Sequence, residues 1–288
     1  MKLEVTSLSA GYGCKLVLDG VELTVPDGQV VTLVGANGSG KSTLLKAVGR
    51  LLKPKSGSIL LDGREIRDYD TAELARRMAI LPQLHHAAGE ITVRELVGFG
   101  RFPHRTGLGG LNAHDREVIE ESLHLTRLEA FGDRRVGTLS GGERQRAWIA
   151  MTLAQEPKLL LLDEPTTFLD IRCQFDIIEL IGDLNRRLGI TVLMVLHDLN
   201  LAARCSDLLV TLKECRIRNV GTPLEIMFPG CDVPCCRRRV RSRFAGGVRR
   251  PRDARRVGGE FRRRPFALGS RAAPRRHGRR PRTSARLG

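Results

Sequence analysis

The sequence predicts an α/β fold with a mainly parallel core sheet, an antiparallel β edge and an inserted helical subdomain. Three features of the 288-residue chain predict this fold. Short strands with alternating apolar residues open the chain. An apolar strand then leads through a glycine-rich loop into a helix, and later apolar strands alternate with helices as far as residue 212. Such alternation is typical of parallel sheets, because parallel neighbours need a long crossover connection.

The first strands predict the antiparallel edge. Apolar and polar side chains alternate in residues 3–5 and 21–25, and the Pro-Asp-Gly sequence at 26–28 predicts a turn. Residues 30–34 are almost continuously apolar, as in a strand that is buried on both faces. Residues 42–50 have the composition of a helix that follows the loop.

The middle of the chain repeats the strand and helix pattern before its character changes. Residues 59–61 predict a strand that ends in the turn Asp62-Gly63, residues 72–77 a short helix, and residues 78–81 another strand. From residue 84 to about 138, a loop with glycine and histidine precedes apolar residues at near-helical spacing. We interpret residues 84–138 as a helical subdomain inserted between two strands of the core.

The last apolar segments complete the predicted core. Leu159–Leu162, Thr191–Leu196 and Leu208–Leu212 have the composition of buried strands. A helix around Phe175–Arg187 lies between the first two, and a short helix at Leu224–Met227 follows the third. These segments alternate as a parallel sheet requires.

The charge of the chain is concentrated at its C-terminal end. The formal net charge is +16, but residues 231–288 hold 20 arginines, no lysine and three acidic residues, so the first 230 residues are close to neutral. We therefore expect one main domain over residues 1–228 and a disordered tail over residues 229–288, whose composition cannot bury a core. Because a GC-rich gene read in a shifted frame gives such a composition, we hypothesise that the tail is an aberrant C-terminus.

Several classes of protein are disfavoured by what the sequence lacks. It has no apolar run of the roughly 18 to 20 residues that a membrane span needs, and no signal peptide precedes the first strand, so we expect the chain in the cytosol. The cysteines lack paired clusters at zinc spacing, which favours reduced structural thiols. We assign no metal to His85, His86 and His104, because exposed loop histidines are commoner than ligands.

The glycine-rich loop predicts a nucleotide phosphate site. Residues 35–42 match the pattern G-x-x-x-x-G-K-[ST], in which backbone N–H groups turn inward around phosphates. Lys41 is expected against the β and γ phosphates, Ser42 on Mg²⁺ and Thr43 near the α phosphate. The motif alone leaves the reaction open between a kinase, a GTPase and an ATPase. The predicted binding residues are Gly35, Asn37, Gly38, Ser39, Gly40, Lys41, Ser42 and Thr43.

Two carboxylates are expected beside this loop. Asp163 and Glu164 follow four leucines, which places them at the carboxyl end of a buried strand. Asp163 is suited to orient the Mg²⁺ shell, and Glu164 to polarise the attacking water as general base. An isolated Asp-Glu pair is commonly a solvated strand end, but the preceding leucines and the following Pro165 argue against that interpretation here.

A second motif, Leu139-Ser140-Gly141-Gly142-Glu143, resembles the signature of ATP-binding-cassette (ABC) ATPases, a branch of the P-loop NTPases. The resemblance implies that ATP and Mg²⁺ are the cofactors and that the chain acts as a homodimer. It also implies that Ser140, Gly141 and Gly142 of each subunit cap the ATP on the phosphate loop of the other. Binding of ATP would close the dimer, and hydrolysis would open it.

The resemblance implies roles for four further residues at positions that match family motifs. Gln83, after an apolar strand, would reach the metal and the attacking water, and His197 would contact the γ phosphate. Tyr12, between two glycines, would stack on adenine, and Asp170 would lie in the loop that crosses the dimer interface. A single histidine or glutamine is more often structural, so placement after predicted strands is what favours function.

Within this superfamily, residues 1–228 look most like the ATPase subunit of bacterial importers for ferric siderophores, haem and vitamin B12. The resemblance implies an integral membrane permease and a substrate-binding protein as partners, and a peripheral position on the cytoplasmic face of the inner membrane. It favours a ferric siderophore as the transported chelate over haem or cobalamin. The segments that carry it are Gly100–His104, Arg146–Met151, Thr166–Asp170 and His197–Arg204.

Two alternatives stay open at the level of sequence. The basic tail would suit an ABC-type ATPase that acts on ribosomes or nucleic acid, although such proteins usually carry two cassettes. An exporter or a metal-ion importer would share the same ATPase motifs. One local departure from the family is Glu214-Cys215, where relatives usually place Asp-Gly or Asn-Gly in a turn that needs positive φ, so we expect Cys215 to strain that hairpin.

Overall fold

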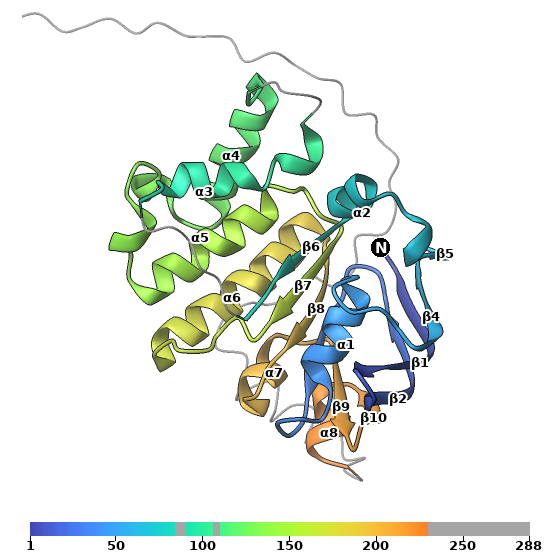
Figure 1. Cartoon of the computed structure of the whole chain (residues 1–288). Helices are drawn as coiled ribbons and strands as arrows, with labels where there is room; N and C mark the ends of the chain where they lie inside the picture. Colours follow the sequence, from blue (N-terminus) through green and yellow to red (C-terminus); the bar gives the residue numbers. More distant parts are fainter. Residues whose placement is uncertain (84–89, 106–109, 230–288) are drawn as a thin grey trace, which may run out of the picture. The chain divides into compact units, whose positions relative to one another are not determined.

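The computed structural model describes residues 1–83, 90–105 and 110–229, and within them ten strands form two sheets (Figure 1). The strands are β1 (Leu3–Tyr12), β2 (Lys15–Val25), β3 (Val30–Val34), β4 (Ser56–Leu61), β5 (Arg64–Glu65), β6 (Met78–Leu81), β7 (Leu159–Asp163), β8 (Thr191–Val195), β9 (Leu208–Lys213) and β10 (Arg216–Gly221). The larger sheet has the order β10-β9-β3-β8-β7-β6, and the smaller one the order β2-β1-β4-β5.

The larger sheet is mainly parallel, as the sequence predicts. β3 pairs in parallel with β8 and β9, and β7 pairs in parallel with β6 and β8. β10 runs antiparallel along β9. Every residue of β3, β7 and β8 is buried, because these central strands have packed elements on both faces. The carboxyl ends of β3, β6, β7 and β8 therefore meet at one edge of the sheet.

The smaller sheet is antiparallel and is made of strands from the beginning of the chain. Leu3 pairs with Val25 and Val5 with Leu23, so the alternating apolar residues share one buried face. At the end of β4, Asp62 and Gly63 both adopt positive φ, which forms the predicted tight turn into β5.

The helices that lie outside the inserted segment cover the two faces of the larger sheet (Figure 1). α1 packs between the two sheets, since one hydrophobic cluster joins its buried residues to β1, β2, β4 and one face of the larger sheet. α6 and α7 pack on the opposite face. The helices are α1 (Lys41–Val48), α2 (Thr71–Arg77), α6 (Ile171–Leu188), α7 (Leu199–Cys205) and α8 (Pro223–Met227).

The inserted segment forms a helical cluster with its own hydrophobic core. α3 (Val93–Phe99) and α4 (Ala113–Leu125) lie within it, and α5 (Gly141–Leu153) begins after residue 138, the predicted end of the insertion. The three helices together bury a third cluster that includes Leu96 and Leu123. Arg101 is almost fully buried there, and its guanidinium donates to Asp115 at 2.9 Å. Such a buried cation is tolerated because it is paired. Short 3₁₀ turns cover Ile66–Asp68, Phe102–His104, Glu129–Phe131 and Val136–Thr138.

The hairpin between β9 and β10 has the backbone that the sequence analysis expects. Glu214 and Cys215 have φ values of 52° and 65°, so both turn residues occupy the left-handed region without being glycine. The backbone oxygen of Cys215 accepts a hydrogen bond from the Asp19 amide at 3.0 Å, which ties the hairpin to β2. The turn therefore combines backbone strain with a tertiary contact.

Some expectations concern residues outside the described part of the chain. The predicted tail, apart from Pro229, lies there, as do His85 and His86. In the described residues, no helix has both the length and the apolar composition that crossing a membrane requires.

Candidate active site

The phosphate loop connects β3 to α1, as the motif requires. A side chain at Gly35 would place its Cβ 2.3 Å from the backbone oxygen of Leu212, and one at Gly40 would place it 2.7 Å from Leu18 Cδ2. Both glycines also have positive φ, of 149° and 104°. A side chain at either position would clash with these atoms, and residues other than glycine rarely adopt such φ values, so glycine is required at both ends of the loop. The loop amides thereby come close to the N-terminus of α1, a location that favours anions.

Lys41 lies over the loop that precedes it. Its Nζ donates to the backbone oxygens of Gly35 and Ala36, each at 2.9 Å, and only 5% of the residue is exposed. Burial lowers the pKa of Lys41, while the nearby carboxylates of Glu164 and Asp163 act in the opposite direction. The lysine therefore supplies a shielded positive charge at the loop, where an anion would interact with it strongly.

Ser39 shows that the loop is suited to an oxygen-rich ligand. Its hydroxyl is buried and has no hydrogen-bond partner among the described residues. A buried hydroxyl without a partner is costly, so the site is suited to a group that accepts a hydrogen bond from it. Phosphate oxygens fit this requirement, and the loop amides and Lys41 add further donors. Asn37 and Gly38 are exposed on the same loop, and Thr43 is buried in α1.

Ser42 and Asp163 form the part of the site that suits a divalent cation. The hydroxyl of Ser42 donates to Asp163 Oδ1 at 2.8 Å. Burial raises the pKa of Asp163, against the hydrogen bond from Ser42, which lowers it. A hydroxyl and a carboxylate are hard oxygen ligands of the kind that Mg²⁺ takes beside phosphates.

Glu164 is the meeting point of three further side chains. Gln83 Nε2 donates to Glu164 Oε2 at 2.7 Å, and His197 Nε2 lies 2.5 Å from Glu164 Oε1. Thr167 Oγ1 donates to Glu164 Oε2 at 3.0 Å. Gln83 follows β6 and His197 follows β8, so neighbouring parallel strands bring them to Glu164 at the end of β7. The structure thus unites the two predicted residues around the predicted base.

The backbone of Glu164 is itself unusual. Its φ is 53°, in the left-handed region that non-glycine residues rarely occupy, at a cost of about 1–3 kcal/mol. The Glu164 amide donates to the backbone oxygen of Val195 at 3.2 Å, which fastens the residue to β8. Strain of this kind persists only where the surroundings fix it, and it is typical of functional sites.

Tyr12 ends β1, and the following strand, β2, runs past the phosphate loop. Half of the surface of Tyr12 is exposed, and the residue pairs with Lys15 at the start of β2. Val17, two residues further along β2, approaches Gly40. The ring is therefore free to receive a flat ligand near the phosphate loop, as stacking on adenine would require.

The signature residues form a second cluster on α5 and α6. Ser140 caps α5, where its hydroxyl and the carboxylate of Glu143 form a reciprocal capping box, and the hydrogen bonds from Ser140 lower the pKa of Glu143. A Cβ on Gly142 would lie 2.9 Å from Cys173 Sγ, and one on Gly141 would lie 3.3 Å from a methyl carbon of Leu169. No contact among the described residues joins this cluster to Lys41. The predicted contact across a dimer stays a prediction.

Asp170 belongs to the same second cluster. Its carboxylate accepts a hydrogen bond from the Cys173 amide at 2.8 Å, and this backbone bond lowers the pKa of Asp170. Asp170 thereby caps α6, which begins four residues before the predicted helix start at Phe175. The cap therefore gives Asp170 a structural role besides the interface role that the resemblance implies.

The sequence analysis missed Thr167 as part of the site. Its position three residues after Glu164 is typical of a turn, because a backbone bond from residue i+3 to residue i closes such a turn. The structure shows this bond, from Thr167 N to Glu164 O at 3.2 Å.

His104, to which the sequence analysis assigns no metal, places its Nε2 2.8 Å from the backbone oxygen of Gln155.

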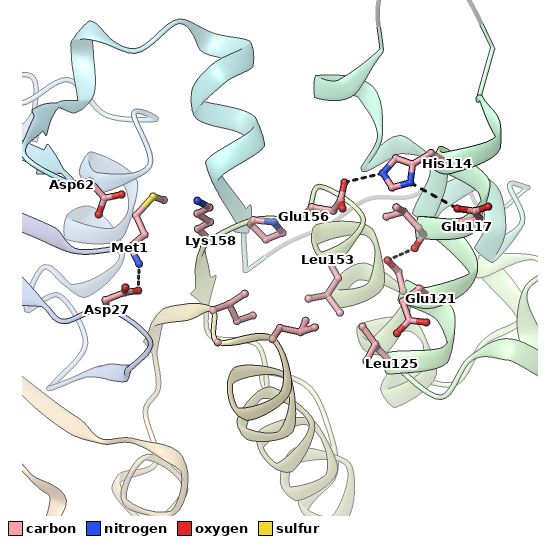
Figure 2. A pocket seen from close by; sticks show the side chains of 16 residues that line it. Met1, Asp27, Asp62, His114, Glu117, Glu121, Leu125, Leu153, Glu156 and Lys158 are labelled. Atoms are coloured by element: carbon pink, nitrogen blue, oxygen red, sulfur yellow. Dashed lines mark hydrogen bonds and ion pairs between the residues drawn. The ribbon is translucent and has the colours of Figure 1, made fainter. Parts of the chain in front are cut away.

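A pocket of about 810 Å³ lies elsewhere, at the amino ends of β7 and β8 (Figure 2). Glu117, Glu121 and Glu156 contribute to its lining on the side of α4, and Lys158 and Asp62 on the side of the two sheets. Its carboxylates would repel phosphates, whereas the phosphate loop offers donors. We therefore assign the chemistry to the carboxyl edge of the sheet and not to this pocket.

Comparisons with known proteins agree with this geometry. Residues 18–167 match the family model described as ABC transporter. The chain is 45% identical over 227 residues to the iron(3+)-hydroxamate import ATP-binding protein FhuC of Bacillus subtilis, covering 79% of this chain and 84% of that one. It is also 45% identical over 226 residues to the ferric enterobactin transport ATP-binding protein FepC of Escherichia coli, with 78% and 83% covered.

A solved structure shares the fold. The dimeric structure of MJ0796, a bacterial ABC transporter cassette, matches with a TM-score of 0.67 at 30% identity, and the match covers 77% of this chain and 98% of that one. It supports the assignment of both the parallel core and the helical insertion to one cassette.

Proposed function

Because the chain belongs to the ABC transporter family of ATPases, we propose that it is the ATP-hydrolysing subunit of an importer that takes up a ferric siderophore. The relatives that support this substrate are named for the import of an iron(3+)-hydroxamate and for the transport of ferric enterobactin. Haem and cobalamin would need the same motor, so the chelate itself is set by other subunits. The basic tail, on which the ribosome or nucleic-acid alternative rests, lies outside the described residues.

The observation that carries the proposal is the arrangement around Glu164. Its carboxylate accepts a hydrogen bond from Gln83 and lies next to His197. The Ser42–Asp163 pair lies at the same edge of the sheet. A base at the end of β7, held between partners that follow β6 and β8 and next to a phosphate loop, is what hydrolysis of a nucleoside triphosphate needs.

Each residue then has a definite task in the proposed reaction. The loop amides, Lys41 and the unpartnered hydroxyl of Ser39 would bind the phosphates of ATP. Ser42 and Asp163 would hold Mg²⁺, which offsets the negative charge of the phosphate oxygens when bound. Glu164 would accept a proton from the attacking water.

The two residues beside Glu164 would couple this base to the nucleotide. His197 would contact the γ phosphate from the end of β8, on the side of Glu164 Oε1. Gln83 would leave Glu164 as the helical segment moves, because its side chain follows β6, immediately before that segment. The rate of hydrolysis would therefore respond to the position of the helical segment.

We further propose that the chain works as a homodimer. Phe168, in the loop before α6, is 86% exposed, and Ile171, the first residue of α6, is 73% exposed; large exposed apolar side chains mark interaction surfaces. Both flank Asp170, which the family resemblance places at the dimer interface. Ser140, Gly141 and Gly142 would then face the nucleotide of the partner subunit. The dimeric MJ0796 cassette supports this assembly.

The remaining partners follow from transport. An integral membrane permease would carry the chelate, a substrate-binding protein would deliver it, and the ATPase subunits would bind the permease at the cytoplasmic face of the membrane. The names of the relatives support this arrangement, because one is an import ATP-binding protein and the other a transport ATP-binding protein.

A pull-down of the tagged full chain from its own cells, in mild detergent with mass spectrometry, tests the partners first. Recovery of a polytopic permease with a substrate-binding protein supports the proposal. Recovery of ribosomes or nucleic acid without a permease contradicts it.

The substrate is tested by uptake in cells that lack the gene and receive it back. Radioactive iron carried by a hydroxamate siderophore or by a catecholate siderophore is the probe. Uptake that returns with the wild-type chain and not with Glu164→Gln supports import driven by this site. If cells without the chain take up iron from both chelates as well as cells with it, the proposal is contradicted. If returning the chain restores only the uptake of haem or cobalamin, that compound replaces the siderophore as the proposed substrate.

A further inference from the structure

Thr167 lies in one of the segments that carry the family resemblance, but the sequence analysis assigns it no role of its own. Thr167 makes two hydrogen bonds to Glu164, from its hydroxyl to Oε2 at 3.0 Å and from its amide to the backbone oxygen at 3.2 Å. Both bonds lie within one four-residue turn. The side-chain bond concerns the carboxylate itself, and the backbone bond concerns the conformation that presents it.

The carboxylate of Glu164 depends on partners of two kinds. Gln83 and His197 reach it from the loops after β6 and β8, so their contacts change whenever those loops move. Thr167 lies on the same turn as Glu164, and its contact therefore survives such movement. Because Gln83 and Thr167 both donate to Oε2, loss of Gln83 leaves that oxygen with a local donor.

The backbone makes this local donor important. Glu164 has a φ of 53°, and its amide is fixed to the Val195 oxygen of β8. The backbone of Glu164 is therefore fixed, although it is strained. The side-chain torsions beyond it can still rotate unless a contact holds the carboxylate. Thr167 is partly buried, and its side chain is β-branched, so it has few rotamers from which to donate.

We propose that Thr167 is the positioning residue for Glu164, and that its hydroxyl holds Oε2 so that Oε1 stays directed toward the attacking water. The inference rests on the proposed role of Glu164 as general base. In this role Thr167 acts through Glu164, to which both its hydroxyl and its amide donate. A misplacement of the base by a fraction of an ångström lowers the rate without changing substrate binding, since geometry matters chiefly in the reacting state.

The bland interpretation is that Thr167 simply forms the turn. In that case its amide does the work, and any residue with an amide and a similar shape would serve. Valine keeps the amide, the β-branch and nearly the volume of threonine but lacks the hydroxyl, and serine keeps the hydroxyl without the methyl group. The two substitutions therefore separate the interpretations.

The test is steady-state ATP hydrolysis by the full chain with Thr167→Val and with Thr167→Ser. We expect Thr167→Val to lower kcat about tenfold with KM for ATP unchanged within about twofold, and Thr167→Ser to restore kcat to within about threefold of wild type. Thr126→Val is the matched control, because Thr126 is buried in the helical segment and donates its hydroxyl to the Ser122 oxygen at 2.8 Å. That variant should keep the wild-type kcat.

Two results would overturn the inference. One is a wild-type kcat for Thr167→Val, and the other is an equal loss of kcat in Thr167→Val and Thr167→Ser, which would reveal a packing role for the methyl group or a fold defect. Thermal unfolding of each variant identifies the fold defect. Glu164→Gln, measured in parallel, separates this outcome from a failure of the proposed function, because hydrolysis by Glu164→Gln at the wild-type rate removes the base whatever Thr167 does.

Discussion

The hydroxyl of Ser42 donates a hydrogen bond to Oδ1 of Asp163 at 2.8 Å, although 121 positions separate the two residues in the chain. The contact joins the first turn of α1 to the end of β7, and it joins the hydroxyl of the phosphate loop to the first of the two carboxylates. Asp163 is buried there, and burial raises its pKa. Without Mg²⁺, the ionised carboxylate of Asp163 therefore lowers the stability of the folded protein.

We expect Asp163→Asn to raise the thermal unfolding midpoint of the protein at pH 7 in the absence of Mg²⁺ and nucleotide. The pKa of Asp163 is higher in the folded than in the unfolded chain, so the folded state binds the proton more tightly, and the ionised carboxylate costs stability as the pH rises through the unfolded value and toward the folded one. Asparagine removes that cost and can still accept from Ser42.

Thermal unfolding at a series of pH values checks this prediction. The advantage of Asp163→Asn over wild type should shrink as the pH falls and vanish well below about 4, where the aspartate is protonated in both states. Hydrolysis should be lost in the same variant, because Asp163 would hold the metal. A lower midpoint at pH 7 than wild type would contradict the assigned effect of burial.

Lys41→Ala should weaken ATP binding about tenfold or more. The ammonium group lies over the phosphate loop at 2.9 Å from two backbone oxygens, and a charged donor to a phosphate contributes about 1.5–3 kcal/mol. Titration with a fluorescent ATP analogue measures the affinity. Lys53→Ala is the control. Because Lys53 is exposed and follows α1, this variant should bind ATP as the wild type does. Unchanged affinity in Lys41→Ala would remove the loop from the binding site.

Glu164→Gln should accumulate as an ATP-bound dimer. The glutamine keeps the shape of the carboxylate but cannot accept the proton of the attacking water, so ATP would bind and persist. Size-exclusion chromatography with ATP and Mg²⁺ should show about twice the mass of the nucleotide-free protein. Adding Ser140→Arg to the same variant should keep it monomeric, since Ser140 is expected to face the nucleotide of the partner. A monomer in both variants would contradict the assembly.

The buried parts of the fold could be predicted from the sequence because their signal is local. Continuous apolar runs predict β3, β7 and β8, and all three lie at the centre of the parallel sheet. α3, α5 and α7 have no individual counterpart among the helices that the sequence predicts, although α3 lies within the segment that it predicts to be helical. Their caps, Thr92, Ser140 and Asp198, are the signals that could have revealed them.

The site divides in the same way. Sequence patterns locate Lys41 and Glu164, because a fixed spacing carries their chemistry. That Gln83 and His197 meet Glu164 depends on the order of β6, β7 and β8 in the sheet, which composition does not specify. The Thr167 contact depends on the positive φ of Glu164, and no sequence pattern predicts a left-handed glutamate.

Cys215→Gly should stabilise the protein. Cys215 has a φ of 65° in the two-residue turn between β9 and β10, a conformation that glycine adopts without steric cost, and relief of such strain contributes about 1 kcal/mol. In a domain of this size that gain corresponds to a rise of about 2–4 °C in Tm. Differential scanning calorimetry of the wild type and the variant measures it.

Cys14 is the matched control, because it lies in the hairpin turn between β1 and β2, and there the positive φ belongs to Gly13 instead. Cys14→Gly should therefore leave Tm unchanged or lower it, since an added glycine only increases the entropy of the unfolded chain. Equal rises in both variants would assign the effect to loss of a thiol, and a fall in Cys215→Gly would show that its side-chain contacts outweigh the backbone strain.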